Sequence, residues 1–186
     1  MKPKPPSPPA SGTVSFGSET LKSSLLARGF TEVERAAVLA VMREETFSPG
    51  TDILTEGLNY QALWVVVSGR CEVVKRVNAA ERQLAVLASG ETFGEMSFFE
   101  QRPHSASVRA IESTVTLRLM AERWQELRTA QPAVLEKISL NMILLLTNRL
   151  RRMDEWTCQL VNNSGSKQQH AEWGDFRSKL YAGWKF

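Results

Sequence analysis

The sequence predicts a single α+β domain that is mainly β, a sandwich or barrel-like roll with short helices before it and a long helix after it. Between residues 46 and 120, short apolar runs alternate with glycine turns, which is typical of many short strands. On both sides of this region, apolar residues recur at the spacing of a helix. The length of 186 residues suits one domain whose core can fold without crosslinks.

The strand region is divided by turn signals such as Pro49-Gly50, Glu56-Gly57 and Ser68-Gly69. Runs of β-branched and apolar residues between the turns predict strands at residues 53–54, 63–67, 71–77, 84–87 and 115–119. Many short strands joined by glycine turns favour a closed or double-layered β architecture over an open sheet.

Helices flank the strands. Residues 19–43 predict two short helices, of which the first ends at Gly29 and the second begins with a capping box of Thr31 and Glu34. After the strands, a helix is expected over residues 121–129. Pro132 then occupies the first position of a long helix that reaches to about residue 161.

Three segments follow from this pattern: an arm over residues 1–18, a folded domain over residues 19–162 and a tail over residues 163–186. The arm has five prolines in its first nine positions, so we expect it to be flexible. The tail combines aromatic and basic residues, which suits docking on a partner, on the chain's own surface or on a membrane face.

Composition argues against several classes of protein. The formal net charge of +3 is only mildly basic. We find no secretory signal and no apolar run long enough to cross a membrane, so we expect a cytoplasmic protein. Two cysteines and two histidines suggest no disulfide framework and no metal site, and Cys71 reads as a core residue. No catalytic triad, Walker loop or kinase signature is present, so we expect no enzyme and no cofactor.

The most informative stretch covers residues 93–108. Gly94 permits a turn and a close backbone approach, and Glu95 directly after it offers a carboxylate to sugar hydroxyls. Residues 97–99 can form one helical turn whose N–H groups face an anion, and residues 103–107 re-enter a strand with small hydroxyl side chains. The pattern indicates a pocket for a sugar phosphate.

This stretch resembles the phosphate-binding cassette of the cyclic-nucleotide-binding domain family, found in the catabolite activator protein and in kinase regulatory subunits. Phe93-Gly94-Glu95 and Pro103-His104-Ser105-Ala106-Ser107-Val108 stand at the family's spacing without a gap, and upstream glycine landmarks match too. The resemblance covers about residues 20–160. It implies a jelly-roll (double-stranded β-helix) β-roll that binds cyclic AMP or cyclic GMP as a regulatory sensor.

The resemblance assigns ligand-binding positions, namely Phe93, Gly94, Glu95, Met96, Ser97, His104, Ser105 and Ala106. It implies that Gly94 offers its N–H to the ligand and that Glu95 accepts from the ribose 2′-hydroxyl. Ser105 and the N–H of Ala106 would face the cyclic phosphate.

One position departs from the family pattern, because His104 stands where the family has an arginine that clamps the cyclic phosphate. Histidine lacks the fixed charge and the planar fork of arginine. Three readings stay open. His104 becomes protonated as the phosphate arrives; or Arg102 or Arg109 replaces the missing charge, although Arg109 falls on the opposite face of a strand; or the pocket is degenerate or takes a different ligand.

The long helix carries a seam with a spacing of about 3.5 residues, formed by Met142, Leu146, Leu150, Met153, Trp156 and Leu160. We expect a parallel homodimer along it, as the resemblance implies. In the family this helix also covers the base, for which Thr147, Arg151 and Asp154 are options.

Residues 163–186 are too few for the helix-turn-helix domain that transcription factors of the family carry after this helix, so we expect no DNA binding. The leading hypothesis is a sensor whose ligand shifts the long helix and so changes the binding of an unidentified protein partner. The alternative is a degenerate domain that binds no nucleotide and acts as a dimeric protein-interaction module.

Overall fold

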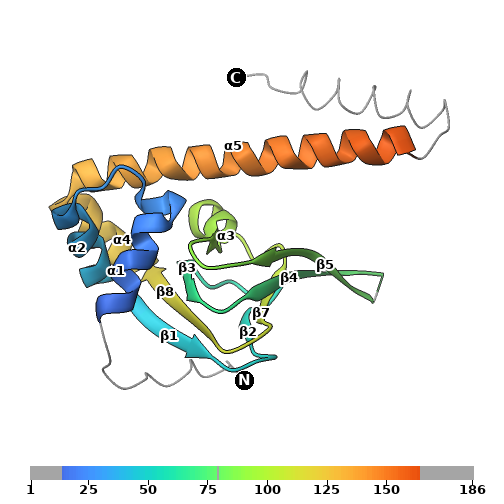
Figure 1. The fold of residues 1–186 in the computed structure, drawn as a ribbon, viewed down its shortest axis with the longest axis horizontal. Coiled ribbons are helices and arrows are strands. Elements are labelled where there is room, and N and C mark those ends of the chain that lie inside the picture. The colour runs from blue at the N-terminus through green and yellow to red at the C-terminus, as the bar shows by residue number, and fades with distance from the viewer. Residues whose placement is uncertain (1–13, 79, 164–186) are drawn as a thin grey trace. The chain divides into compact units, whose positions relative to one another are not determined.

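The computed structural model describes residues 14–78 and 80–163, which hold two antiparallel sheets with helices at both ends of the chain (Figure 1). The predictions for residues 1–13 of the arm and for the tail lie outside the described residues. The elements in chain order are α1 (Val14–Ser23), the 3-10 turn η1 (Leu25–Ala27), α2 (Glu32–Val41), β1 (Arg43–Phe47), β2 (Asp52–Leu54), β3 (Ala62–Ser68), β4 (Cys71–Val77), β5 (Ala80–Leu87), β6 (Thr92–Phe93), α3 (Glu95–Glu100), β7 (Ser107–Ala110), β8 (Thr114–Met120), α4 (Ala121–Ala130) and α5 (Pro132–Asn163).

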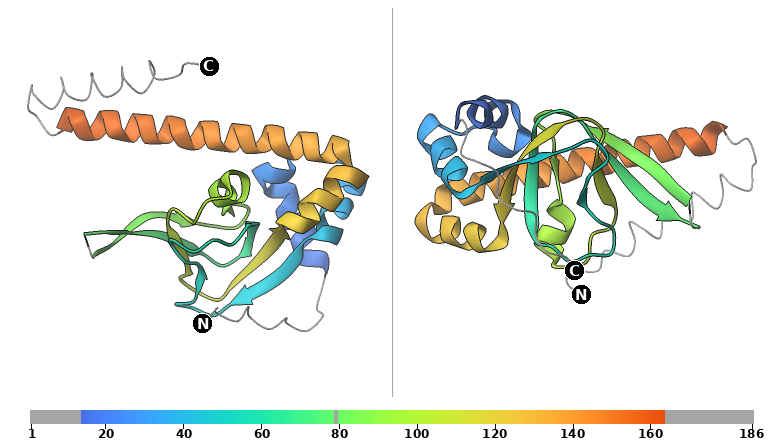
Figure 2. Two further views of the ribbon diagram at one scale, coloured as in Figure 1. Left: turned by 180° about the vertical axis from the view of Figure 1, so that it is seen from behind. Right: turned by 90° about the horizontal axis from the view of Figure 1, so that it is seen from below.

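The eight strands within the described residues form two four-stranded sheets with the orders β1-β8-β3-β6 and β2-β7-β4-β5. Every pairing is antiparallel, and apart from the β4–β5 hairpin consecutive strands alternate between the two sheets, as in a roll (Figure 2). The core lies between the two sheets, because its buried members come from both: Leu54, Ala62, Trp64, Val66, Cys71, Leu87, Phe93 and Val108. The predicted mainly-β roll with helices before it and a long helix after it is confirmed.

The five strands predicted from apolar runs are all present, whereas β1, β6 and β7 carry weaker signals. β1 has the sequence Arg-Glu-Glu-Thr-Phe, in which three of five residues are charged, yet it pairs along its whole length with β8. Pairing with β8 overrides its poor strand propensity. Thr114 and Thr116 of β8 are buried along with Leu117 and Leu119, so side chains on both faces of this strand are covered.

The N-terminal helices differ from the prediction at their ends. α1 begins at Val14, inside the predicted arm, and ends at Ser23 rather than at Gly29. The prolines of the arm all precede residue 10, so nothing in the sequence opposes a helix from Val14 onward. Ser24 ends α1 because its side chain accepts from the N–H of Leu26 and caps η1 instead.

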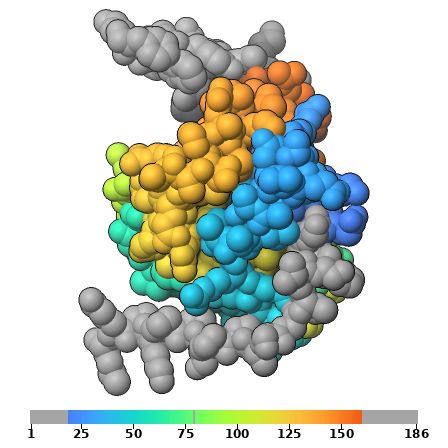
Figure 3. Space-filling view, turned by 90° about the vertical axis from the view of Figure 1, so that its left-hand side faces the viewer, coloured from blue at the N-terminus to red at the C-terminus, as the bar shows by residue number. Residues whose placement is uncertain are grey.

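The first turns of α5 are fixed to the N-terminal helices. The capping box of Thr31 and Glu34 is confirmed, and both carboxylate oxygens of Glu34 also accept from Lys137, at 2.7 and 2.8 Å. Asn141 donates to the carbonyls of Leu26 and Arg28 at 3.0 and 2.9 Å. Figure 3 faces this side of the molecule, where α2, α4 and the start of α5 gather.

The chain divides into two units at Met142, and the second unit begins at Ile143. Within the described part of the second unit, α5 continues as a helix to Asn163. It passes the predicted end near residue 161 by two residues. No helix in the described ranges is long and apolar enough to cross a membrane.

Candidate functional site

The site is organised around Gly94, which links β6 to α3. Its φ of +82° is left-handed, a conformation that side chains resist. A Cβ at this position would lie 2.8 Å from both the carbonyl oxygen of Ala62 and the ring of Trp64. Trp64 in turn stacks on Phe93 with 5.6 Å between ring centroids. Phe93 is therefore part of the core, and only glycine fits between β6 and α3.

α3 alternates buried and exposed side chains. Glu95, Ser97 and Phe98 are buried, and Glu95 is only 5% exposed. Met96 and Phe99 are exposed. The predicted helical turn is thus confirmed, and it extends over six residues. The carboxylate expected to meet a sugar hydroxyl lies beneath the surface.

The second half of the cassette returns beside the first. Gln101 ends α3 with a φ of +57°, which reverses the chain toward β7. The N–H of His104 donates to the carbonyl of Leu58 at 2.9 Å, and the carbonyl of His104 accepts from Gly57 at the same distance. The hydroxyl of Ser105 lies 3.7 Å from the sulfur of Met96. Both halves of the predicted site therefore meet in space, although Phe93 serves the core.

His104 points into the interior and is only 5% exposed. Its Nδ1 lies 2.6 Å from Oγ of Ser97, and this hydroxyl also donates to the carbonyl of Gly94 at 3.2 Å. Which of the two groups donates in the contact between Ser97 and His104 depends on the tautomer of the ring. Nε2 is buried and has no hydrogen-bond partner in the described structure. Burial lowers the pKa of His104, so the ring is neutral at pH 7.

Three side chains were candidates to supply positive charge to the cassette, and two of them do not supply it in this structure. His104 supplies none in this conformation. Arg109 is engaged elsewhere, since it donates to Asp52 at 2.7 Å and to Glu81 at 2.9 Å. It therefore faces away from the cassette, as strand alternation predicts. Arg102 is exposed on the loop between α3 and β7.

Lys75 is a neighbour of the cassette that the sequence analysis missed. Its Nζ donates to the carbonyl of Ser105 at 2.6 Å and lies 3.7 Å from a carboxylate oxygen of Glu56. Strand alternation in the sequence indicates its face, because Lys75 follows Val73 by two residues on β4 and therefore lies on the same side of the strand. The separation of 30 residues from Ser105 concealed it.

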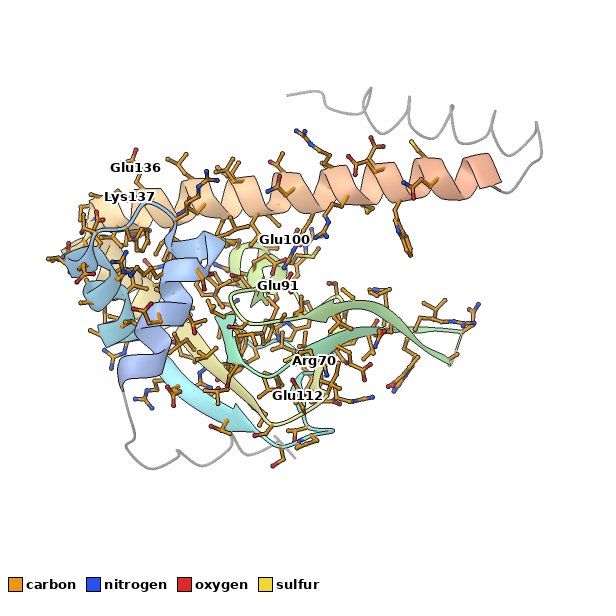
Figure 4. All side chains as sticks on the ribbon, in the orientation of Figure 1. Arg70, Glu91, Glu100, Glu112, Glu136 and Lys137 are labelled. Carbon is orange, nitrogen blue, oxygen red and sulfur yellow. The ribbon has the colours of Figure 1, made fainter. Side chains whose placement is uncertain are left out.

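Other charged pairs of the roll lie outside the cassette. Arg70 and Glu112 pair at 3.2 Å, and Figure 4 shows both side chains together beside β4. Arg118 and Glu45 pair at 2.8 Å across β8 and β1. No group of three or more His, Cys, Asp or Glu side chains that could hold a metal ion occurs in the ranges 14–78 and 80–163.

The seam predicted on α5 needs one correction. Met142 is only 2% exposed, so it packs within the chain and is not available to a second copy. Leu146, Leu150, Met153 and Trp156 are all exposed, Trp156 by 69%. The side chain of Leu160 lies outside the described residues. The assignment of Thr147, Arg151 and Asp154 as base contacts stays a prediction.

Comparison with known proteins finds relatives in one family. The family model of the cyclic nucleotide-binding domain matches residues 44–131. The cyclic AMP receptor protein of Thermus thermophilus is 34% identical over 135 residues, covering 72% of this chain and 61% of that protein. The chain thus spans less than two thirds of this relative.

Solved structures share the fold. The crystal structure of the Thermus thermophilus catabolite activator protein matches with a TM-score of 0.66 at 33% identity, covering 74% of this chain and 63% of that chain. A cyclic nucleotide-binding domain from Methylobacillus flagellatus KT matches with a TM-score of 0.68 at 25% identity, covering 74% and 78%. The roll of this chain is therefore the β-roll of these structures.

Replacing Gly94 with alanine tests the turn that positions α3. We expect G94A to lose more stability than G57A, measured by urea denaturation. Gly57 has nearly the same φ, +81°, but an added Cβ meets nothing within 4 Å, so G57A carries only the backbone cost of about 1–2 kcal/mol. The clash with Ala62 and Trp64 adds about 1–3 kcal/mol in G94A. Equal losses in the two variants would contradict the close packing of Gly94.

The buried neutral His104 predicts a pH dependence of stability. Below its ordinary pKa of about 6.5, the unfolded chain takes up a proton that the folded chain resists. The free energy of unfolding therefore falls as pH drops from 7.5 to 5.5. Thermal denaturation of the wild type and of H104Q, both of which retain His170, measures this term. A wild-type loss no steeper than that of H104Q would show that His104 is not held neutral.

Proposed function

We propose that this chain binds a cyclic mononucleotide, cyclic AMP or cyclic GMP, as a non-enzymatic regulatory module, because the family model of the cyclic nucleotide-binding domain matches residues 44–131. The observation that carries the proposal is the forced turn at Gly94. It brings the first half of the cassette, on α3, against the second half at residues 104–106.

Each half has a role in this proposal. The carboxylate of Glu95, held at the first position of α3, accepts from the ribose 2′-hydroxyl. Ser105 is exposed at the cassette and presents its hydroxyl to the cyclic phosphate, with the N–H of Ala106 beside it. A hydrogen bond to an ionised partner, such as the carboxylate of Glu95 or the cyclic phosphate, is stronger than one between neutral groups. The backbone bonds of His104 to Gly57 and Leu58 support this arrangement because they fix the loop without using its side chain.

We also propose that the chain dimerises along α5. Leu146, Leu150, Met153 and Trp156 step by four, three and three residues, and all four side chains are exposed. An exposed apolar seam at this spacing is typical of a coiled-coil contact. The seam starts after Met142, one step later than the sequence suggested. In such a dimer, ligand binding would shift α5 and so change the binding of a protein partner.

A second function is favoured by the interior position of His104. Without the arginine of the family pattern, the cassette loses a charge-assisted bond worth about 1.5–3 kcal/mol. A domain that no longer binds nucleotide would act through the seam of α5 alone, as a dimeric interaction module.

Calorimetric titration of the purified chain with cyclic AMP and with cyclic GMP separates the two functions. We expect saturable binding of at least one nucleotide. E95Q should weaken it by about tenfold, the value of one charge-assisted hydrogen bond. The matched control is E100Q, which alters an exposed carboxylate on the same helix (Figure 4). Folded wild-type protein that gives no heat with either nucleotide would overturn the sensor function and leave the interaction module.

A further inference from the structure

We propose that Lys75 supplies the positive charge that holds the ligand's phosphate at the cassette, in place of the arginine that His104 replaces. The inference rests on the proposed function, because it needs an anionic ligand at residues 104–106. It adds a residue from a different strand to the site.

The pairing of β4 places Lys75 beside the cassette. β4 and β7 pair without a shift from Cys71↔Ala110 to Val74↔Ser107, so Lys75 is the first residue of β4 beyond β7. The chain that precedes Ser107 is the cassette itself. Lys75 therefore lies where the phosphate-facing residues enter the sheet.

Strand alternation sets the face on which Lys75 lies. Cys71 belongs to the core cluster and Val73 packs against it, so both point between the sheets. Lys75 is two residues further and shares this face. The register shift against β5 does not alter this, because the extra residue is Leu84 on β5. The lysine thus extends from the inner side of β4 at its open end.

Glu56 holds the ammonium group in this position. One oxygen of Glu56 accepts from the N–H of Arg76 at 2.9 Å, and the other lies 3.7 Å from Nζ of Lys75. The N–H of Glu56 donates to the hydroxyl of Ser107 at 2.9 Å. Glu56 is therefore tied to both β4 and β7, and it acts as a positioning residue for Lys75.

The present contacts of Lys75 leave it able to turn to a ligand. Its Nζ donates to the carbonyl of Ser105 at 2.6 Å, and an ammonium has two further hydrogens to donate. Its side chain is 42% exposed, so the charge is accessible from solvent. Phosphate oxygens bound at Ser105 would accept these two hydrogens of Lys75.

Other cations near the cassette are less suited to the role. His104 is neutral and bonded to Ser97, and Arg109 is bonded to Asp52 and Glu81. Arg102 is the competitor, because it is exposed two residues before His104. A lysine at this place binds phosphate as a point charge, without the two-bond fork of arginine.

The test is a titration of cyclic AMP and cyclic GMP into wild type, K75M, K75R and R102M. K75M removes the charge while keeping side-chain length, and we expect it to weaken nucleotide binding by about tenfold to a hundredfold. K75R restores the charge and should recover most of the affinity. R102M should bind like the wild type. Thermal denaturation shows that each variant is folded.

Several results would overturn the inference. K75M binding within twofold of the wild type, or an equal loss in K75R, would show that the charge of Lys75 does not hold the phosphate. A loss in R102M with none in K75M would assign the role to Arg102. A folded wild type that binds neither nucleotide would remove the proposed function itself. That result is distinguishable because it appears before any variant is compared.

Discussion

The contact between Gly94 and the ring of Trp64 is the constraint on which the site depends. Trp64 lies on a central strand and stacks on Phe93, so packing in the core fixes the position of its ring. The chain after β6 has to turn directly beside this ring. Gly94 turns there because it has no Cβ to meet the ring or the carbonyl of Ala62. α3 starts at the next residue, and its direction places Ser97 under the returning loop. The site is thus an extension of the core rather than a separate surface feature.

The bond between Ser97 and His104 follows from this geometry and changes the electrostatics of the cassette. A residue at position 104 can point outward as a charge or inward as part of the packing. The neutral ring of His104 points inward, where burial lowers its pKa and its Nδ1 lies 2.6 Å from the hydroxyl of Ser97. The cost is a buried Nε2 without a partner. An anionic ligand must then find its positive charge on another element, and Lys75 of β4 stands 2.6 Å from the cassette backbone.

Much of the fold, and the approach of the two halves of the cassette, could be predicted from the sequence. The apolar strands, the capping box of Thr31 and Glu34, and the spacing of the cassette are local patterns, and the structure contains all of them. The orientation of His104 was not predictable, because it depends on a contact with Ser97 that exists only after α3 and the loop have packed. Met142 fits a helical seam by spacing, but spacing does not tell which buried surface a side chain meets.

Lys75 shows the same limit at longer range. The residue is one charge among many in the sequence, and its place beside Ser105 depends on the register of β4 against β7. Register is a property of the assembled sheets and of the face each strand buries. A pattern search along one segment finds the cassette, but it does not find the neighbour that a second strand brings to it.

The most direct test of this account is the protonation state of His104 with and without nucleotide, read from the ¹⁵N resonances of its imidazole ring at pH 7. The account predicts a neutral ring in both states, because the phosphate is held by another cation. A ring protonated on both nitrogens in the nucleotide complex would contradict it, and would show that His104 leaves Ser97 to bind the phosphate itself.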